Sequence, residues 1–274
     1  MRAWGSVRKT SRDSVATASC KTISDSLVLL AASSVAGAVN SIAGGGSLIT
    51  FPVLVWLGRE PILANATNTV SLSPGSVAAL LGFRRELIGL RRRLVWGTVP
   101  SLVGGTLGAW LLLRTPSAVF AALVPYLILF ATALFACSGP LHALARRKTR
   151  SDDGMPPGPS FLFYHLLVSV YGGYFGAGIG IMMLAGLGLA GFAAIHRMIA
   201  LRNYYAILIN GIAAAYFILF GAVSWPDAAV LTVGQVVGGL VGARIARSLS
   251  PSTVRWIVVA IGVAMALSLF RRPV

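Results

Sequence analysis

Apolar stretches of about 20 residues recur along nearly the whole chain, and they limit the folds open to it. A helix of about 20 apolar residues crosses the ~30 Å hydrocarbon core of a bilayer. Of the 274 residues, 56% are hydrophobic and 11% are charged, and the mean hydropathy is +0.81. A soluble domain carries about 25% charged residues. The sequence therefore predicts an all-α integral membrane protein that crosses the membrane several times.

The formal net charge of +16 does not indicate a nucleic-acid partner. The Lys and Arg residues gather in short breaks between apolar runs, which is typical of topology signals. None of the seven acids lies in the middle of an apolar run, and the two cysteines have neither a metal-ligand nor a disulfide spacing. Phosphate-loop, dinucleotide and zinc-protease motifs are absent. We expect a bilayer as partner, no cofactor and no enzymatic activity.

The chain divides into two similar halves. A basic tail, 1–25, precedes a first transmembrane repeat, 26–137; a polar linker rich in proline, 138–160, leads to a second repeat, 161–271. In both repeats a glycine-rich break is followed, 22 or 23 residues after its last glycine, by an asparagine, Asn68 or Asn203. The segments VGGTLGA (103–109) and VGGLVGA (237–243) then match. This order predicts about eight transmembrane helices in two repeats.

Basic loops suggest that the repeats are inverted relative to each other. Arginines 84, 85 and 91–93 indicate one cytoplasmic loop, and the linker is equally basic. The equivalent loop of the second repeat, 221–227, has no Lys or Arg, which favours the outer face. The same scheme places the basic tail outside, against the positive-inside rule, so the side of the termini stays open.

The glycine breaks predict a binding site. Non-helical backbone survives at membrane depth only where it is buried in protein or lines a cavity, and a helix that starts there aims its amides at a ligand. Amides and helix N-termini favour an anion. The expected substrate-binding residues of this glycine-broken or re-entrant region are Asn40, Gly44, Gly45, Gly46, Ser47, Thr67, Asn68, Gly176, Gly178, Gly180, Arg202 and Asn203.

Each of these residues also has a purely structural interpretation. Glycines allow close helix packing, asparagines bond between helices, and Arg202 could be an interfacial arginine that reaches toward the headgroups. A proton relay through His165 or His196 is a further hypothesis, since no acid lies within a span.

The motifs GAVNSIAGGGSLITFP (37–52), ATN (66–68), YGGYFGAGIGIMML (171–184) and LRN (201–203) resemble those of the TauE/SafE sulfite exporter family. The resemblance covers about residues 31–270. It implies an inner-membrane protein of about eight helices that moves sulfur-containing anions. Two departures stand out: Asn40 replaces an acid that many relatives carry, and Thr69 replaces a frequent lysine.

From these features we expect a transporter that exports sulfite or a related sulfur-containing anion, such as an organosulfonate. A channel-like anion pore and a non-transporting membrane scaffold or assembly protein remain alternatives. An oligomer is compatible with the sequence.

Overall fold

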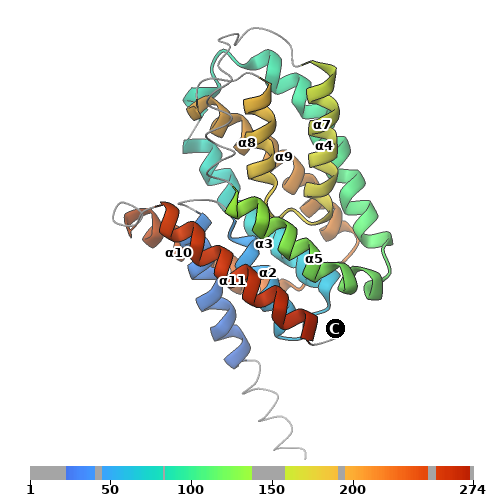
Figure 1. Ribbon diagram of the computed structural model, residues 1–274, viewed down its shortest axis with the longest axis vertical. Helices are drawn as coiled ribbons and strands as arrows, with labels where there is room; N and C mark the ends of the chain where they lie inside the picture. The colour runs from blue at the N-terminus through green and yellow to red at the C-terminus, as the bar shows by residue number, and fades with distance from the viewer. Residues whose placement is uncertain are drawn as a thin grey trace, which may run out of the picture.

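The computed structural model describes residues 23–40, 45–82, 84–137, 158–190, 195–245 and 251–271. Every regular element within these ranges is a helix (Figure 1). The predicted all-helical fold class is thus confirmed. Most of the predicted tail and linker, 1–22 and 138–157, lies outside the described residues, and helices begin directly after both, at Ile23 and Pro159.

Each half opens with a helix, continues with a short second helix and ends with three long α-helices. The first half contains a first helix, Ile23–Asn40, then α2 (Ser47–Trp56), α3 (Pro61–Gly82), the 3-10 helix η1 (Arg84–Leu87), α4 (Arg91–Arg114) and α5 (Ser117–Ala136). The second half contains α7 (Pro159–Tyr174), α8 (Ile179–Leu189), α9 (Ile195–Leu219), α10 (Trp225–Ile245) and α11 (Pro251–Arg271). In each half, a break therefore separates a longer opening helix from a short second one.

Four helices of the described part are long and apolar enough to cross a membrane: Ile23–Asn40, Arg91–Arg114, Ser117–Ala136 and Arg197–Leu219. The expectation of about eight spans is therefore confirmed for these four helices only. Helix α3 has 22 residues and is about 33 Å long. Its polar side chains Asn65, Thr67 and Asn68 are buried in the protein. Because these side chains do not face lipid, α3 can be long without being uniformly apolar.

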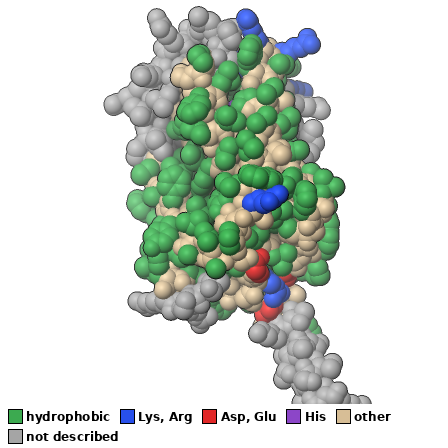
Figure 2. All heavy atoms as spheres, turned by 90° about the vertical axis from the view of Figure 1, so that its right-hand side faces the viewer, with side chains coloured by type: hydrophobic (Ala, Val, Ile, Leu, Met, Phe, Trp, Pro, Cys, Tyr) green, Lys and Arg blue, Asp and Glu red, His purple; other side chains and the backbone are tan. Residues whose placement is uncertain are grey.

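An ion-pair cluster brings three segments to one end of the molecule. Arg59, between α2 and α3, pairs with Asp227 in the first turn of α10 at 2.8 Å and with Asp25 of the first helix at 3.5 Å. The first helix therefore enters, and α2 leaves, at the same end. Helix α4 begins with Arg91 and Arg92, after α3 has reached the opposite end of the molecule. Figure 2 shows acidic side chains near the lower end, with a basic side chain between them, further basic side chains at the upper end, and a face between the two ends that is hydrophobic except for a basic side chain.

Glycine-rich helices pack against the opening helix of the opposite half. On α4, a Cβ at Gly104 would meet Ser169 of α7, and one at Gly108 would overlap the backbone of Val170. Residue numbers rise together along this contact, so α4 and α7 run parallel and side by side (Figure 1). Small residues allow such close approach of helix backbones in membranes.

The other half shows the same kind of contact. On α10, a Cβ at Gly234 would overlap Ser33 of the first helix, and one at Gly238 would overlap Ser34. These two helices also run parallel. The matched segments 103–109 and 237–243 thus have a common packing role: each presents glycines to the helix that precedes the break of the other half.

Candidate functional site

The first break lies between Asn40 and Ser47. Gly45 has a φ of +93°, a left-handed conformation that glycine adopts without the strain of a side chain. Gly46 is the N-cap residue of α2, and its carbonyl accepts the amides of Ile49 and Thr50. The amide of Ser47 has no acceptor among the described residues. The break therefore starts a short helix whose first amide finds no acceptor in the described part of the chain, so this amide can serve a ligand.

The second break lies between Tyr174 and Ile179. Gly176 and Gly178 have φ values of +80° and +82°. The Tyr171 hydroxyl donates to the carbonyl of Ala177 at 2.8 Å and so holds the loop in place. Helix α8 begins at Ile179, and within the described part of the chain the amide of Gly180 has no acceptor. Both halves thus have an interruption between helices at the predicted glycines, and the amides of Ser47 and Gly180 find no acceptor among the residues that the structure describes.

Helix α5 lies beside both breaks. A Cβ at Gly45 would lie 2.7 Å from the Phe135 ring, and one at Gly178 would lie 3.5 Å from Leu134. The two contacted residues are neighbours in the last turns of α5. In addition, Phe51 of α2 packs edge-to-face on Phe175 of the second break, with ring centroids 5.2 Å apart. Breaks separated by about 130 residues of chain are thus brought close together in the core.

Asn68 stands beside the first turn of α2. The Thr50 hydroxyl donates to Asn68 Oδ1 at 2.5 Å, and Asn68 is only 2% exposed. This bond uses the amide oxygen and leaves both Nδ2 hydrogens, for which no acceptor is found among the described residues. A side-chain amide whose donors find no acceptor among the described residues suits a ligand that offers acceptors.

Arg202 stands beside the first turn of α8. A Cβ at Gly180 would lie 3.4 Å from Arg202 Cδ and 3.7 Å from Nε, so the missing side chain makes room for the guanidinium stem. Arg202 donates from Nε and Nη2 to Asn203 Oδ1, at 3.1 and 2.8 Å. No carboxylate of the described residues lies within ion-pair distance of it.

The charge balance at this point is therefore positive. A helix N-terminus carries about half a positive charge, and the Arg202 guanidinium adds a full one. The neutral Asn203 oxygen accepts two hydrogen bonds and compensates neither charge. An arginine placed against a helix N-terminus is stabilised when an anion binds between them.

The remaining predicted residues differ in their surroundings. Asn40 ends the first helix and is exposed, while Gly44 lies outside the described residues. Thr67 is buried, and its hydroxyl oxygen accepts the amide of Ser224 at 3.0 Å. That bond ties α3 to the loop before α10, which is the interhelical role weighed for this segment from the sequence.

Asn65 was not among the predicted site residues. Its Nδ2 donates to the carbonyl of Tyr174, the last residue of α7, at 2.9 Å. Its Oδ1 is buried without a partner, and the residue is 1% exposed. Asn65 thus connects α3 of the first half to the second break. Its spacing of three residues from Asn68, which places both on one helix face, was the available sequence signal.

His165 is buried away from both breaks. Its Nε2 lies 2.8 Å from the Ser101 hydroxyl of α4, and its ring stacks on Phe161 and packs on Tyr205. It is 2% exposed. The side chain of His196 lies outside the described part. Groups of three or more His, Cys, Asp or Glu residues able to hold a metal are absent from the described residues.

Comparison with known proteins places this architecture in a family. A family model described as "Sulfite exporter TauE/SafE" matches residues 29–269. The chain is 31% identical over 247 residues to "Probable membrane transporter protein ORF9" of a Sinorhizobium species, which covers 89% of this chain and 92% of that protein. It is 33% identical over 245 residues to a "Probable membrane transporter protein" of Haemophilus influenzae, covering 85% and 89%.

A third relative is "Probable membrane transporter protein YfcA" of Escherichia coli K12, 31% identical over 251 residues and 88% of each chain. No solved structure matches the chain. The family match spans all but the two ends of the chain, and the motifs that carried the resemblance lie within it. The chain is therefore a multi-pass membrane protein that belongs to the sulfite exporter TauE/SafE family.

Proposed function

We propose that the protein is a transporter that moves a sulfur-containing oxyanion of the sulfite class outward across the cell membrane. The anion binds between the two glycine breaks. The observation that carries this proposal is the Arg202 guanidinium beside Gly180 at the start of α8, with no carboxylate of the described residues paired to it. The family description, which names sulfite, supports the substrate class.

The anion's partners come from both halves. From the second half they are the Gly180 amide and the guanidinium of Arg202, which Asn203 orients. From the first half they are the Ser47 amide and the free Nδ2 of Asn68, which Thr50 orients. Two halves that each supply one helix N-terminus and one side-chain donor can hold an anion while the halves move relative to each other.

An inverted repeat is part of the same proposal. The opening helix of each half runs parallel to the glycine-rich helix of the other half, in two equivalent contacts. The first helix starts at the Arg59 end, whereas α7 runs parallel to α4 and so starts at the opposite, Arg91 end. These directions support two hairpins that enter the membrane from opposite sides. Arg85, Arg91 and Arg92 lie at the end where α7 starts, and the positive-inside rule favours the assignment of that end to the cytoplasm.

The direction of transport follows from charge. A potential of about 100 mV, negative inside, drives each negative charge outward with about 2.3 kcal/mol. Outward transport of an anion therefore requires no coupling ion. The described acids are confined to helix ends and loops, where they are not available for proton coupling at the breaks.

The test is flux into proteoliposomes that contain the purified protein. Sulfite, thiosulfate, sulfate and an alkyl sulfonate are offered, each with and without an imposed potassium-diffusion potential. The proposal predicts saturable flux of sulfite or a close relative, accelerated by a potential that favours anion movement.

Two results would count against it. Flux that does not saturate, together with single-channel conductance in planar bilayers, would indicate a pore. No flux of any of the four anions by folded protein would indicate a scaffold. Gly180→Leu, which places a side chain against Arg202, should abolish the flux, whereas Gly211→Leu on the open side of α9 should not, because nothing lies within 4 Å of Gly211.

A further inference from the structure

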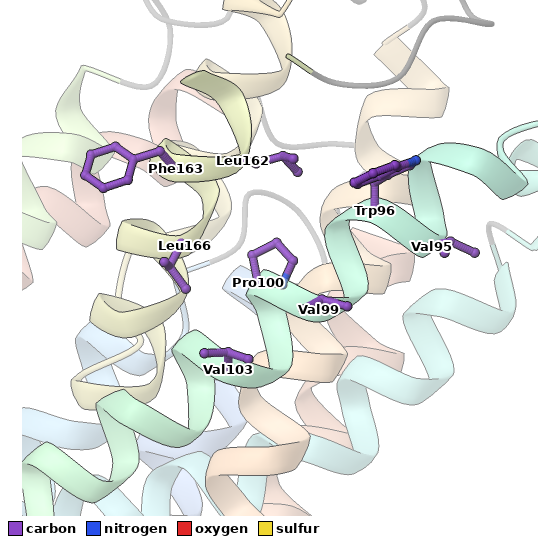
Figure 3. A pocket seen from close by; sticks show the side chains of 8 residues that line it. All are labelled: Val95, Trp96, Val99, Pro100, Val103, Leu162, Phe163 and Leu166. Atoms are coloured by element: carbon purple, nitrogen blue, oxygen red, sulfur yellow. The ribbon is translucent and has the colours of Figure 1, made fainter. Parts of the chain in front are cut away.

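A groove of about 560 Å³ lies on the outside of the helix pair α4 and α7 (Figure 3). Its walls are apolar. Helix α4 contributes Val95, Trp96, Val99, Pro100 and Val103, and α7 contributes Leu162, Phe163 and Leu166. This groove is on the lipid-facing surface and is separate from the glycine breaks, which are in the core.

The close approach of α4 and α7 explains why the groove forms. The two helices meet through Gly104, Gly108 and Ser169, small residues that bring the backbones together on the inner side. On the outer side, Pro100 of α4 lines the groove, and its short ring leaves the groove open. Long side chains at the rim, Trp96 and Phe163, are 49% and 64% exposed and border the hollow. The result is an apolar groove between the two helices.

Two arginines stand at one end of the groove. Arg91 and Arg92 are the first residues of α4 and are exposed. They precede Val95 and Trp96 by four residues each, so they lie on the same helix face, one turn toward the membrane surface. Neither makes an ion pair with a described acid. An apolar slot that ends in two unpaired cations at the interface matches the two parts of an anionic lipid.

We propose that this groove binds an anionic phospholipid, with one acyl chain between α4 and α7 and the headgroup phosphate on Arg91 and Arg92. Tryptophan prefers the headgroup level of a bilayer, so Trp96 fits the boundary between the two parts. A second copy of the chain fits less well. Two copies with the same orientation in the membrane would bring their arginines to the same depth, where like charges repel.

The experiment is native mass spectrometry of the full-length protein in detergent, titrated with phosphatidylglycerol or with phosphatidylcholine of the same acyl chains. We expect wild type to retain phosphatidylglycerol selectively. The double variant Arg91→Gln/Arg92→Gln should lower its retention about 25-fold, because each basic side chain near an anionic surface contributes about fivefold. Arg114→Gln, at the opposite end of α4, is the matched control and should retain the lipid.

A second pair of variants tests whether the acyl chain of the lipid lies in the groove. Val99 is 64% exposed at the groove, and Val119 is 50% exposed on α5. Val99→Trp should fill the slot and lower retention of phosphatidylglycerol by at least about tenfold, the effect of withdrawing two CH₂ groups. Val119→Trp should leave it unchanged. Glycerol phosphate alone should not bind, because it lacks the acyl chains that would fill the groove.

Three outcomes would overturn the proposal. The first is equal retention of both lipids by wild type. The second is unchanged retention in Arg91→Gln/Arg92→Gln, which would mean adventitious lipid only. The third is a dimer that Val99→Trp dissociates, which would assign the groove to a second copy. Anion flux is measured separately on the same variants, so failure of the lipid site is distinguishable from failure of the transport proposal.

Discussion

Arg59 and Asp227, 168 residues apart in the chain, form a two-point contact: Nε donates to Oδ2 at 2.8 Å and Nη2 donates to Oδ1 at 3.1 Å. The hydrogen bond to Asp227 is the main cause that raises the pKa of Arg59 above its ordinary value. Ser224 donates to the same carboxylate at 2.9 Å. The contact joins the loop after the first hairpin to the start of α10, so the two halves are tied together at this end.

Breaking this pair should cost measurable stability. Both side chains keep partial access to solvent, which limits such pairs to about 1 kcal/mol or less, and the bidentate geometry places this pair at the upper end of that range. A double-mutant cycle of Arg59→Gln and Asp227→Asn, followed by thermal unfolding in detergent, should give a coupling energy of about 1 kcal/mol. The coupling should shrink at high salt, since salt screens exposed charges. Additive single effects would contradict a direct pair.

The glycine contact between α4 and α7 predicts opposite effects for two similar substitutions. Gly108→Ala should destabilise the protein by about 3 kcal/mol, because the new Cβ would overlap backbone atoms of α7, which cannot move aside as a side chain can. Gly211→Ala on α9 meets nothing within 4 Å and should stabilise by up to about 1 kcal/mol through helix propensity. Unfolding temperatures of the two variants check this; equal effects would refute the packing role.

At Gly178, the effect of the left-handed backbone on stability can be measured separately from the effect of side-chain packing. A Cβ there would make only ordinary contacts of 3.5 to 3.7 Å, so the penalty of Gly178→Ala comes from its φ of +82°. We expect a loss of about 1–2 kcal/mol. Gly178→Asn should lose less, although Asn is larger, because Asn tolerates this conformation. Thermal unfolding should rank glycine first, Asn second and Ala third; Ala above Asn would mean that side-chain size dominates.

His165 provides a test of the proton-relay hypothesis. It is buried between Ser101, Phe161 and Tyr205, with no acidic partner among the described residues. His165→Gln should lower the unfolding temperature, because Ser101 loses its partner and two aromatic rings lose a neighbour. Flux at a fixed potential should keep its dependence on internal pH. A flattened pH profile in this variant would instead support a relay.

Sequence reasoning predicted the helices well where their boundaries are marked by glycine, proline or charge. The breaks after Asn40 and before Ile179 were expected from Gly44–Gly46 and Gly176–Gly180, because glycine both permits positive φ and interrupts an apolar run. Helix α9 begins at Ile195, before Arg197 and Arg202, which resemble loop residues by hydropathy alone. The packing of Arg202 against Gly180 of α8 is a tertiary effect that a single segment does not reveal.

The candidate site was predictable by residue type but not by partner. Asn68 and Asn203 were found from their similar distances, 22 and 23 residues, to the last glycine of each break. The bond from Thr50 to Asn68 and the position of Arg202 over Gly180 depend on the angle between helices, which sequence spacing does not specify. Asn65 was missed because its contact, the carbonyl of Tyr174, belongs to the backbone of the other half.

The most direct test of the account is the affinity of purified protein for radiolabelled sulfite, compared between wild type, Arg202→Gln, Arg202→Lys and the control Arg114→Gln. Charge-assisted hydrogen bonds contribute about 1.5–3 kcal/mol each. Arg202→Gln should therefore bind at least about tenfold more weakly while remaining folded, Arg202→Lys should recover part of the loss, and Arg114→Gln should match wild type. Unchanged sulfite affinity in folded Arg202→Gln would contradict an anion site at the start of α8.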